Sequence, residues 1–277
     1  MQIISGTERA REIRARVREE NHRYGVVPHL AMIVVGDFPE NLKYVGMKEK
    51  AAVEVGGSAR LIHLSGETRR EELLKVIAGL NQDAGTDGIL LQLPLPVHLE
   101  NTRDDFLQAI ELEKDVDGFN PVNRGRLSDG PPLFISCVAL GSLGVVEQVF
   151  PNLKGKRACL VGDSFDLVLP LATMLIARGC RVTVAGDYQP AEAGKADILV
   201  VEKGYPNMVK GSELENQEML LIDAGFYWQD GRSCGNVDRE SVEGCPGFLV
   251  PSPGGLGPLT IATLMENLSR AARRDGR

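Results

Sequence analysis

Residues 157–185 have the sequence RACLVGDSFDLVLPLATMLIARGCRVTVA. The apolar spacing predicts strands over Arg157–Val161 and Arg181–Ala185, joined through a glycine turn by an apolar helix from about Leu167 to Arg178. A strand, a helix and a strand in succession form a parallel βαβ unit with a right-handed crossover. Further strands are expected at Ile198–Val201 and Met219–Asp223. The second half of the chain is therefore predicted to be a Rossmann-like domain.

The first hundred residues alternate strands and helices in the same way. Ser5-Gly6-Thr7-Glu8 and Thr68-Arg69-Arg70-Glu71 both match the capping box that precedes a helix. Helices are expected from the first box to about Tyr24, over Asn41–Val55 and after the second box, and strands over Leu30–Val35, Ala59–Leu64 and Gly88–Leu91. Strands separated by helices of this length favour a parallel sheet.

Two further segments complete the organisation of the chain. Lys114–Pro132 is rich in Asp, Gly, Asn and Pro and is predicted to be a functional loop or linker rather than core. Pro258–Arg273 has helical spacing and is expected to pack on one of the domains. The sequence thus predicts an α/β fold of two domains.

Composition excludes several classes of protein. The 277 residues are 43% hydrophobic and carry 31 basic against 38 acidic side chains, a formal charge of −7, so nucleic acid is not an expected partner. The longest apolar stretch, Leu167–Ala177, is about half of the roughly 20 residues that span a bilayer, and no secretion signal is recognisable, so a cytoplasmic protein is expected. Five cysteines without a C-x-x-C pair predict neither a metal site nor a disulfide framework.

Two motifs in the first domain are candidates for chemistry. Tyr44 and Lys48 are four residues apart on a predicted helix and share one face. A partly desolvated lysine has a lowered pKa and can act as a general acid or base, although an ordinary solvated helix face is the alternative. Gln92-Leu-Pro-Leu-Pro96 follows a strand, at the end where α/β sheets bind ligands, and its alternative is a rigid edge turn.

Two loop motifs are also unusual. Lys114-Asp-Val-Asp117-Gly places two carboxylates in a loop, either as a hydrogen-bonding clamp for an amino-heterocycle or as a pair of Asx turns, and the residues alone favour the turns. Pro251–Thr260 (PSPGGLGPLT) is too rich in Gly and Pro for regular structure. Its glycines allow a ligand to approach the backbone closely, and Pro258 suits the first turn of a helix.

In this order and spacing the four motifs resemble the bifunctional methylenetetrahydrofolate dehydrogenase/methenyltetrahydrofolate cyclohydrolase family over nearly the whole chain. The blocks that carry the resemblance are IISGTERAREIR, LAMIVVGDFPENLKYVGMKEKAA, DGILLQLPLPVHL, KDVDGFNPVNRGRL, ADILVVEKGYP and PSPGGLGPLTIATLMEN. The resemblance implies a catalytic domain formed by residues 1–137 and 258–277, with the C-terminal helix packed back on it. It also implies a Rossmann-like nucleotide domain over residues 138–257, a folate cleft between the domains and a homodimer.

The resemblance further implies the roles of individual residues. Lys48 matches the family's catalytic lysine, Tyr44 the tyrosine beside the folate ring, and Gln92 the glutamine that orients the lysine. Asp117 matches the acid that holds the pterin, and Pro253-Gly254-Gly255 matches a segment that lines the folate pocket. The implied substrate is a tetrahydrofolate derivative, with no metal.

The nucleotide turn departs from the family pattern V-G-R-S-x-x-V-G-x-P. Gly162, Ser164 and Pro170 match, but Asp163 replaces the arginine and Val168 the second glycine. An arginine neutralises the 2′-phosphate of NADP, whereas the carboxylate of Asp163 repels it. Asp166 adds negative charge at a helix N-terminus that otherwise attracts pyrophosphate. NADP is therefore disfavoured, and binding of any nicotinamide nucleotide is open.

Other positions differ as well. Asp187 lies about where a Rossmann acid binds the ribose of NAD, so a switch to NAD is conceivable. Glu202-Lys203-Gly204 carries charged residues in a segment that borders the nicotinamide in the family, and Ser136–Gly141 replaces the family's P-C-T-P-x-G. Asn41 replaces a serine of the family pattern, and this conservative change is compatible with a folate-binding site in the first domain.

Three functions compete. The first is a methenyltetrahydrofolate cyclohydrolase of folate one-carbon metabolism whose dehydrogenase activity is weak or lost. The second is a bifunctional enzyme that uses NAD. The third is a non-catalytic folate-binding or partner-binding protein on the same fold, against which Lys48 argues, because binding alone needs no lysine with a tuned pKa.

Overall fold

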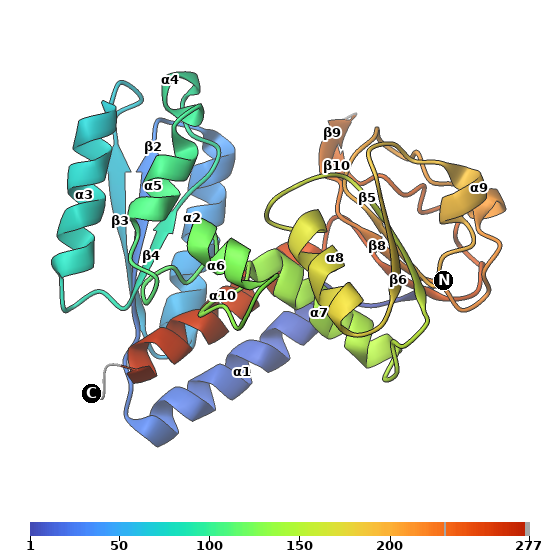
Figure 1. Ribbon diagram of the computed structural model, residues 1–277, viewed down its shortest axis with the longest axis horizontal. Helices are drawn as coiled ribbons and strands as arrows, with labels where there is room; N and C mark the ends of the chain where they lie inside the picture. The colour runs from blue at the N-terminus through green and yellow to red at the C-terminus, as the bar shows by residue number, and fades with distance from the viewer. Residues whose placement is uncertain (230, 275–277) are drawn as a thin grey trace. The chain divides into compact units, whose positions relative to one another are not determined.

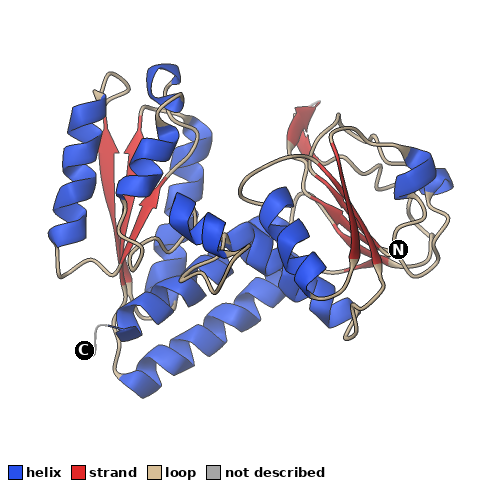
Figure 2. Ribbon diagram, in the orientation of Figure 1, coloured by secondary structure: helices blue, strands red, loops and turns tan. Residues whose placement is uncertain are grey.

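The computed structural model describes residues 1–229 and 231–274, apart from the side chain of Glu40. The chain divides into two compact units. The six-stranded unit contains Met1–Ala10 and Val138–Thr260, and the three-stranded unit contains Arg11–Cys137 and the residues from Ile261 onward. Helices and strands alternate in both units (Figure 2). The α/β fold with two domains is thereby confirmed.

The six-stranded unit is built on a parallel sheet whose strand order is β1-β11-β8-β7-β5-β6, of which Figure 1 labels β5, β6 and β8. Its strands are β1 (Gln2–Ile3), β5 (Arg157–Val161), β6 (Arg181–Ala185), β7 (Ile198–Val201), β8 (Leu220–Asp223) and β11 (Phe248–Val250). Its other elements include α7 (Cys137–Val149, from Val138 on), α8 (Val168–Ala177), α9 (Pro190–Ala193), the 3-10 turn η1 (Gly211–Glu213) and the hairpin of β9 (Tyr227–Gln229) and β10 (Arg232–Cys234). Neighbouring strands contribute Val161, Val201, Leu221 and Leu249 to one buried core.

This sheet agrees with the predicted Rossmann-like domain. The strands and the apolar helix expected between residues 157 and 223 are present, each within one residue of its predicted bounds. The order β6-β5-β7-β8-β11 is that of a doubly wound sheet, whose direction of winding changes between β5 and β7. Ligands of such sheets bind outside the carboxyl ends of the strands at that point.

The N-terminal boundary differs from the predicted one. Gln2 N donates to Gly247 O at 2.8 Å and Ile4 N to Leu249 O at 2.8 Å, which adds β1 to the edge of the six-stranded sheet. Met1–Ala10 therefore group with this unit and not with the first domain. A strand of two residues has no periodicity by which the sequence could have revealed it.

The three-stranded unit has a parallel sheet with the order β3-β2-β4. Its strands are β2 (His29–Val35), β3 (Ser58–Leu64) and β4 (Gly88–Leu91). Its helices are α1 (Gly6–Tyr24, from Arg11 on), α2 (Pro39–Glu54), α3 (Arg70–Gln82), α4 (Val97–Glu100), α5 (Arg103–Ala109), α6 (Pro121–Arg126) and the later part of α10 (Leu256–Arg274). Residues on both faces of β2 are buried, so this central strand is covered on both sides, as the apolar run predicted.

The C-terminal helix packs back on the first domain, as predicted. Leu264, Met265 and Leu268 of α10 share a buried core with residues of β2, β4, α1 and α2. The later half of α10 lies beside the later half of α1 (Figure 1), where Arg273 Nη1 contacts Glu20 Oε2 at 3.2 Å. Ser269 Oγ also donates a buried hydrogen bond to Asn21 Oδ1.

The caps of two helices test the predicted capping boxes. Glu8 N donates to Ser5 Oγ at 3.2 Å, as expected at the start of α1. At α3 the prediction is wrong by one residue: Arg69 N donates to Glu72 Oε2 at 2.9 Å, so Arg69 and not Thr68 is the N-cap. The segment Lys114–Pro132, expected to be loop, contains α6, which Asn120 caps by accepting from Val122 N at 2.8 Å.

Lys114 anchors the start of the loop that carries Asp117. Its Nζ donates to the carbonyl oxygens of Leu80, Asn81 and Asp83 at 3.0, 2.7 and 2.9 Å. These carbonyls lie at the end of α3, where a cation is favoured by the helix dipole. An ammonium has three donors, and all of them are used here.

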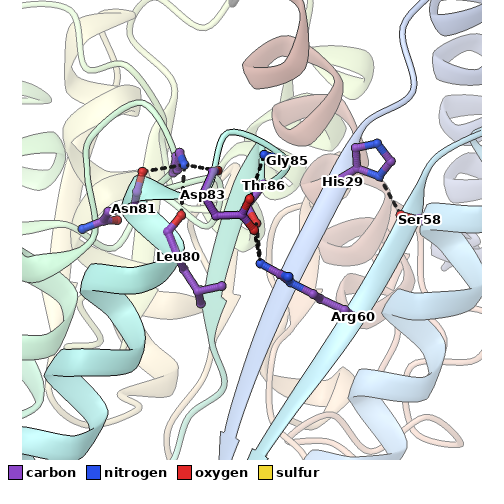
Figure 3. Close-up of polar contacts among 9 residues, drawn as sticks. His29, Ser58, Arg60, Leu80, Asn81, Asp83, Gly85 and Thr86 are labelled. Carbon is purple, nitrogen blue, oxygen red and sulfur yellow. Dashed lines mark hydrogen bonds and ion pairs between the residues drawn. The ribbon is translucent and has the colours of Figure 1, made fainter.

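Asp83, just after the end of α3, also forms several polar contacts (Figure 3). Its carboxylate accepts from Gly85 N and Thr86 Oγ1, both at 2.9 Å, and pairs with Arg60. These hydrogen bonds, that of Gly85 first, lower the pKa of Asp83 to about 2. The connection between α3 and β4 is therefore held by Lys114 on one side and by the ion pair of Asp83 with Arg60 on the other.

Candidate active site

Lys48 and Gln92 meet at the carboxyl end of the three-stranded sheet. Lys48 lies on α2, and its Nζ donates to Gln92 Oε1 at 2.9 Å. Gln92 directly follows β4, and its backbone N–H donates to Ile33 O at 2.9 Å, so the residue continues the sheet. Its Nε2 donates to Leu93 O at 2.8 Å, which turns Oε1 toward the lysine. The structure therefore brings together two of the predicted catalytic residues.

Lys48 is a buried lysine. The side chain is only 8% exposed, and this burial lowers its pKa from the ordinary value, while Asp117 and then Cys137 raise it. An ordinary solvated helix face is thus the wrong interpretation for Lys48. Tyr44, one turn earlier on α2, is 36% exposed and forms part of the same helix face at the surface.

The two carboxylates of the Asp115/Asp117 loop differ in role. Asp115 is buried and accepts hydrogen bonds from Phe119 N, Asn120 N and Asn123 Nδ2 at 3.0, 2.9 and 2.7 Å. Burial raises its pKa to about 7, against the effect of these donors. Asp115 is therefore the turn-forming residue, whereas Asp117 acts electrostatically on Lys48.

Cys137 belongs to this site, and the sequence interpretation missed it. Its thiol lies at the start of α7, is hydrogen-bonded with Asp117 and donates to Val116 O at 3.4 Å. Asn267 Nδ2, from α10, donates to Val116 O at 2.9 Å and to Cys137 Sγ at 3.5 Å. Burial and then Asp117 raise the pKa of Cys137, which keeps it a neutral thiol. The indication in the sequence was that Cys137 lies in the Ser136–Gly141 block, which replaces the family's P-C-T-P-x-G.

The predicted Pro253-Gly254-Gly255 segment lies in the six-stranded unit, whereas Lys48, Gln92 and Asp117 lie in the three-stranded unit. Pro253 and Gly254 are exposed, and Gly254 has a φ of +95° that favours glycine. Gly255 is buried, and a Cβ there would lie 2.3 Å from Pro251 O. Close backbone packing therefore requires Gly255 whether or not a ligand is bound.

The turn after β5 has the backbone of a nucleotide-binding turn. Gly162 has a φ of +149°, and Ser164 Oγ accepts from Leu167 N and Val168 N at 3.2 and 3.1 Å at the start of α8. Its charges differ from those of a phosphate site, since Asp163 forms an ion pair with Lys203 at 2.5 Å. The turn therefore combines the backbone of a nucleotide-binding turn with a carboxylate at position 163.

Asp187, the predicted ribose ligand, follows β6 and is exposed. The neighbouring Tyr188 is half-buried against the core of the unit, and its hydroxyl donates to Glu213 Oε2 at 3.1 Å. The structure places Asp187 at the carboxyl edge of the sheet, two residues after the end of β6, as a ribose ligand requires.

Within residues 1–229 and 231–274, no three His, Cys, Asp or Glu side chains are arranged to hold a metal ion. Among the helices in the same part of the chain, none combines the length and apolar character needed to span a bilayer.

Comparison with known proteins matches both halves of the chain. Residues 4–117 match the family model "Tetrahydrofolate dehydrogenase/cyclohydrolase, catalytic domain", and residues 136–276 match "Tetrahydrofolate dehydrogenase/cyclohydrolase, NAD(P)-binding domain". The chain is 55% identical over 276 residues to "Bifunctional protein FolD 1" of Syntrophomonas wolfei, covering 99% of both chains.

Solved structures give the same result. The FolD methylenetetrahydrofolate dehydrogenase/cyclohydrolase of Campylobacter jejuni is 34% identical, with a TM-score of 0.91 and 99% of both chains covered. The Trypanosoma brucei dehydrogenase-cyclohydrolase, complexed with NADP and an inhibitor, is 28% identical with a TM-score of 0.91, covering 99% of this chain and 98% of that one.

Proposed function

The chain belongs to the tetrahydrofolate dehydrogenase/cyclohydrolase family, and from this premise we propose that it hydrolyses methenyltetrahydrofolate at the Lys48 site. The observation that carries the proposal is a buried lysine with a lowered pKa, held at 2.9 Å by Gln92 and facing the charge of Asp117. A lysine that needed only to be charged would cost less free energy at the surface. Burial of its amine is the arrangement required for proton transfer.

In the proposed reaction, water attacks the cationic methenyl carbon and forms a C–O bond. Unprotonated Lys48 accepts the proton that the water loses. The attack leaves a neutral ring with a hydroxyl on the reacting carbon. One C–N bond of this ring then breaks as the protonated lysine gives its proton to the leaving nitrogen, and the hydroxyl loses its proton as its oxygen becomes the formyl C=O. Lys48 takes up that second proton and passes it to solvent, so the hydrolysis releases one proton overall. Gln92 holds Nζ in position throughout, because its own amide is fixed by Leu93.

Substrate positioning is assigned to the residues around the lysine. Asp117 would accept hydrogen bonds from the amino and N–H groups of the pterin, which places the reacting carbon near Nζ. Tyr44, partly exposed one turn from Lys48, would lie against the folate ring. Pro253, Gly254 and Gly255 are proposed to line the folate pocket on the basis of the family resemblance.

For the linked dehydrogenase activity we propose that it is weak or lost. Asp163 carries the wrong charge for the 2′-phosphate of NADP, and Val168 stands where a glycine would let pyrophosphate approach. We therefore assign no hydride-transfer step to this chain.

A bifunctional enzyme that uses NAD is the second candidate. It is favoured by the match of residues 136–276 to the NAD(P)-binding domain of the family, and by Asp187 at the edge where a ribose would bind. Gly162 and Ser164 would then contact the pyrophosphate.

One set of assays separates the candidates. The purified chain is tested for hydrolysis of methenyltetrahydrofolate and, separately, for reduction of NAD and of NADP with methylenetetrahydrofolate. Hydrolysis without reduction supports the first candidate, and hydrolysis with NAD reduction supports the second. Folate binding without either activity contradicts both and supports a non-catalytic protein. Homodimerisation and a cytoplasmic location stay predictions, the former to be checked by light scattering.

A further inference from the structure

Glu202 lies at the point of the six-stranded sheet where a nucleotide would bind. It follows β7, and its backbone N–H donates to Val161 O, the last residue of β5, at 2.9 Å. The strand order changes direction between β5 and β7, so the ends of these two strands flank the crevice in which a doubly wound sheet binds its ligand.

The side chain of Glu202 fills the space that Gly162 leaves open. A Cβ on Gly162 would lie 2.6 Å from Glu202 Oε2, 3.2 Å from Glu202 Cβ and 2.9 Å from Val168 Cγ2. The glycine of a Rossmann turn is useful because its missing side chain lets a phosphate approach the backbone. Here a carboxylate from the neighbouring strand takes up that space.

The hydrogen-bond donors of the turn are also directed at protein atoms. Ser164, through its side chain and its backbone, hydrogen-bonds with the carboxylate of Glu202, which favours its charged form. Leu167 N and Val168 N, at the start of α8, donate to Ser164 Oγ. These are the kinds of donors that bind a phosphate at a helix N-terminus.

The charges around Glu202 add to this effect. Asp163 and Asp166 lie close enough to raise the pKa of Glu202, although burial is the largest cause of that rise. Lys203, the next residue along the chain, pairs with Asp163 at 2.5 Å. A pyrophosphate entering the turn would therefore meet three carboxylates and a lysine that already has a partner.

We propose that Glu202 is the residue that excludes dinucleotides from this unit, by holding its carboxylate in the place of a dinucleotide phosphate so that the turn rejects NAD and NADP alike. The inference rests on the proposed loss of dehydrogenase activity and assigns a cause to it. It also separates two effects. Asp163 opposes the 2′-phosphate that NADP alone carries, whereas Glu202 opposes the pyrophosphate that both dinucleotides share.

The test is calorimetric titration of NAD, NADP and inorganic pyrophosphate into the wild-type chain and into Glu202→Ala and Glu202→Gln variants. Glu202→Ala is expected to bind both dinucleotides at least tenfold more tightly than wild type, which corresponds to about 1.4 kcal/mol. The ratio of NAD to NADP affinity stays the same, because Asp163 is unchanged. Glu202→Gln has nearly the same shape without the charge, so its gain measures the electrostatic part.

Glu218→Gln is the matched control. It removes one negative charge from the same unit, but Glu218 is exposed and precedes β8, at the opposite end of the sheet from the turn. Its affinities are expected to stay within about twofold of wild type. A gain equal to that of Glu202→Gln would show that net charge, and not the position of Glu202, is responsible.

Two results would overturn the inference. One is micromolar binding of NAD or NADP by the wild-type chain, and the other is folded Glu202 variants that bind no more tightly than wild type. If either variant loses its circular-dichroism spectrum, the wild-type chain is titrated from about pH 8 to about pH 5. Protonation of Glu202 should then tighten NAD binding, with Asp163, Asp166 and Lys203 as the other groups facing the carboxylate. No tightening counts against the inference.

The hydrolysis assay on the wild-type chain keeps this test separate from the proposed function. Hydrolysis with no gain of nucleotide binding in the Glu202 variants refutes the role of Glu202 and leaves the cyclohydrolase standing. A gain of binding without hydrolysis refutes the cyclohydrolase and leaves the role of Glu202 standing.

Discussion

Replacement of Lys48 by Met removes the proposed acid/base group with little change in buried volume. Its Nζ contacts Gln92 Oε1 at 2.9 Å, so the substitution leaves that oxygen without this donor, at a cost to stability of about 1 to 3 kcal/mol. Removal of a buried polar amine offsets part of this cost. General acid/base catalysis contributes about 10² to 10⁴ in rate, or about 2.7 to 5.5 kcal/mol of barrier, so kcat should fall by that factor.

The assay is the loss of methenyltetrahydrofolate absorbance at saturating substrate, with folate affinity measured separately by calorimetry. Affinity is expected to stay within about tenfold of wild type, because Asp117 and Tyr44 remain. Lys50→Met is the matched control, since Lys50 is exposed on the same helix. A Lys48→Met enzyme with kcat within about tenfold of wild type would refute the assignment of Lys48 to proton transfer.

Three further substitutions test neighbouring parts of the structure. Asp117→Asn removes a charge that raises the pKa of Lys48. The acidic limb of the kcat profile should therefore move to lower pH, and a move to higher pH would contradict the proposed base. Asp115→Ala leaves three buried donors unpaired, so the free energy of unfolding should fall by about 3 kcal/mol or more in urea. In the Glu202→Ala background, Asp163→Arg should raise the ratio of NADP to NAD affinity at least tenfold, about 1.4 kcal/mol, and an unchanged ratio would exclude Asp163 as a discriminator.

Much of the fold follows from periodicity in the sequence. The inner strands of both sheets are nearly continuous apolar runs, such as His29–Val35 and Ile198–Val201, because both of their faces are covered. The pairing of Lys48 with Gln92 is expected only from the resemblance to the family, and the structure brings the two side chains together from α2 and from the end of β4. The periodicity is local, whereas this pairing joins residues from two different elements.

Other features depend on contacts between residues whose proximity the sequence does not indicate. Asp115 and Asp117 are two residues apart in one loop, and only the coordinates show that Asp115 accepts three protein donors while Asp117 faces Lys48. Cys137 reaches Asp117 from the start of α7. A single cysteine in a sequence does not indicate a functional site, because buried free cysteines are ordinary core residues.

The nucleotide turn shows why a motif cannot be judged from its own residues. Read along the chain, Gly162 and Ser164 count in favour of binding, and Asp163 and Val168 count against it. The strand order brings Glu202 to the same place from β7, where its carboxylate reaches both the open side of Gly162 and the donors of Ser164. A glycine turn that is free to bind phosphate and one that is filled by the protein's own anion therefore have the same local sequence. The difference lies in the side chain at the end of the adjacent strand. Asp163→Arg and Val168→Gly together would remove the charge repulsion and the branched side chain, but the carboxylate of Glu202 would still occupy the phosphate position.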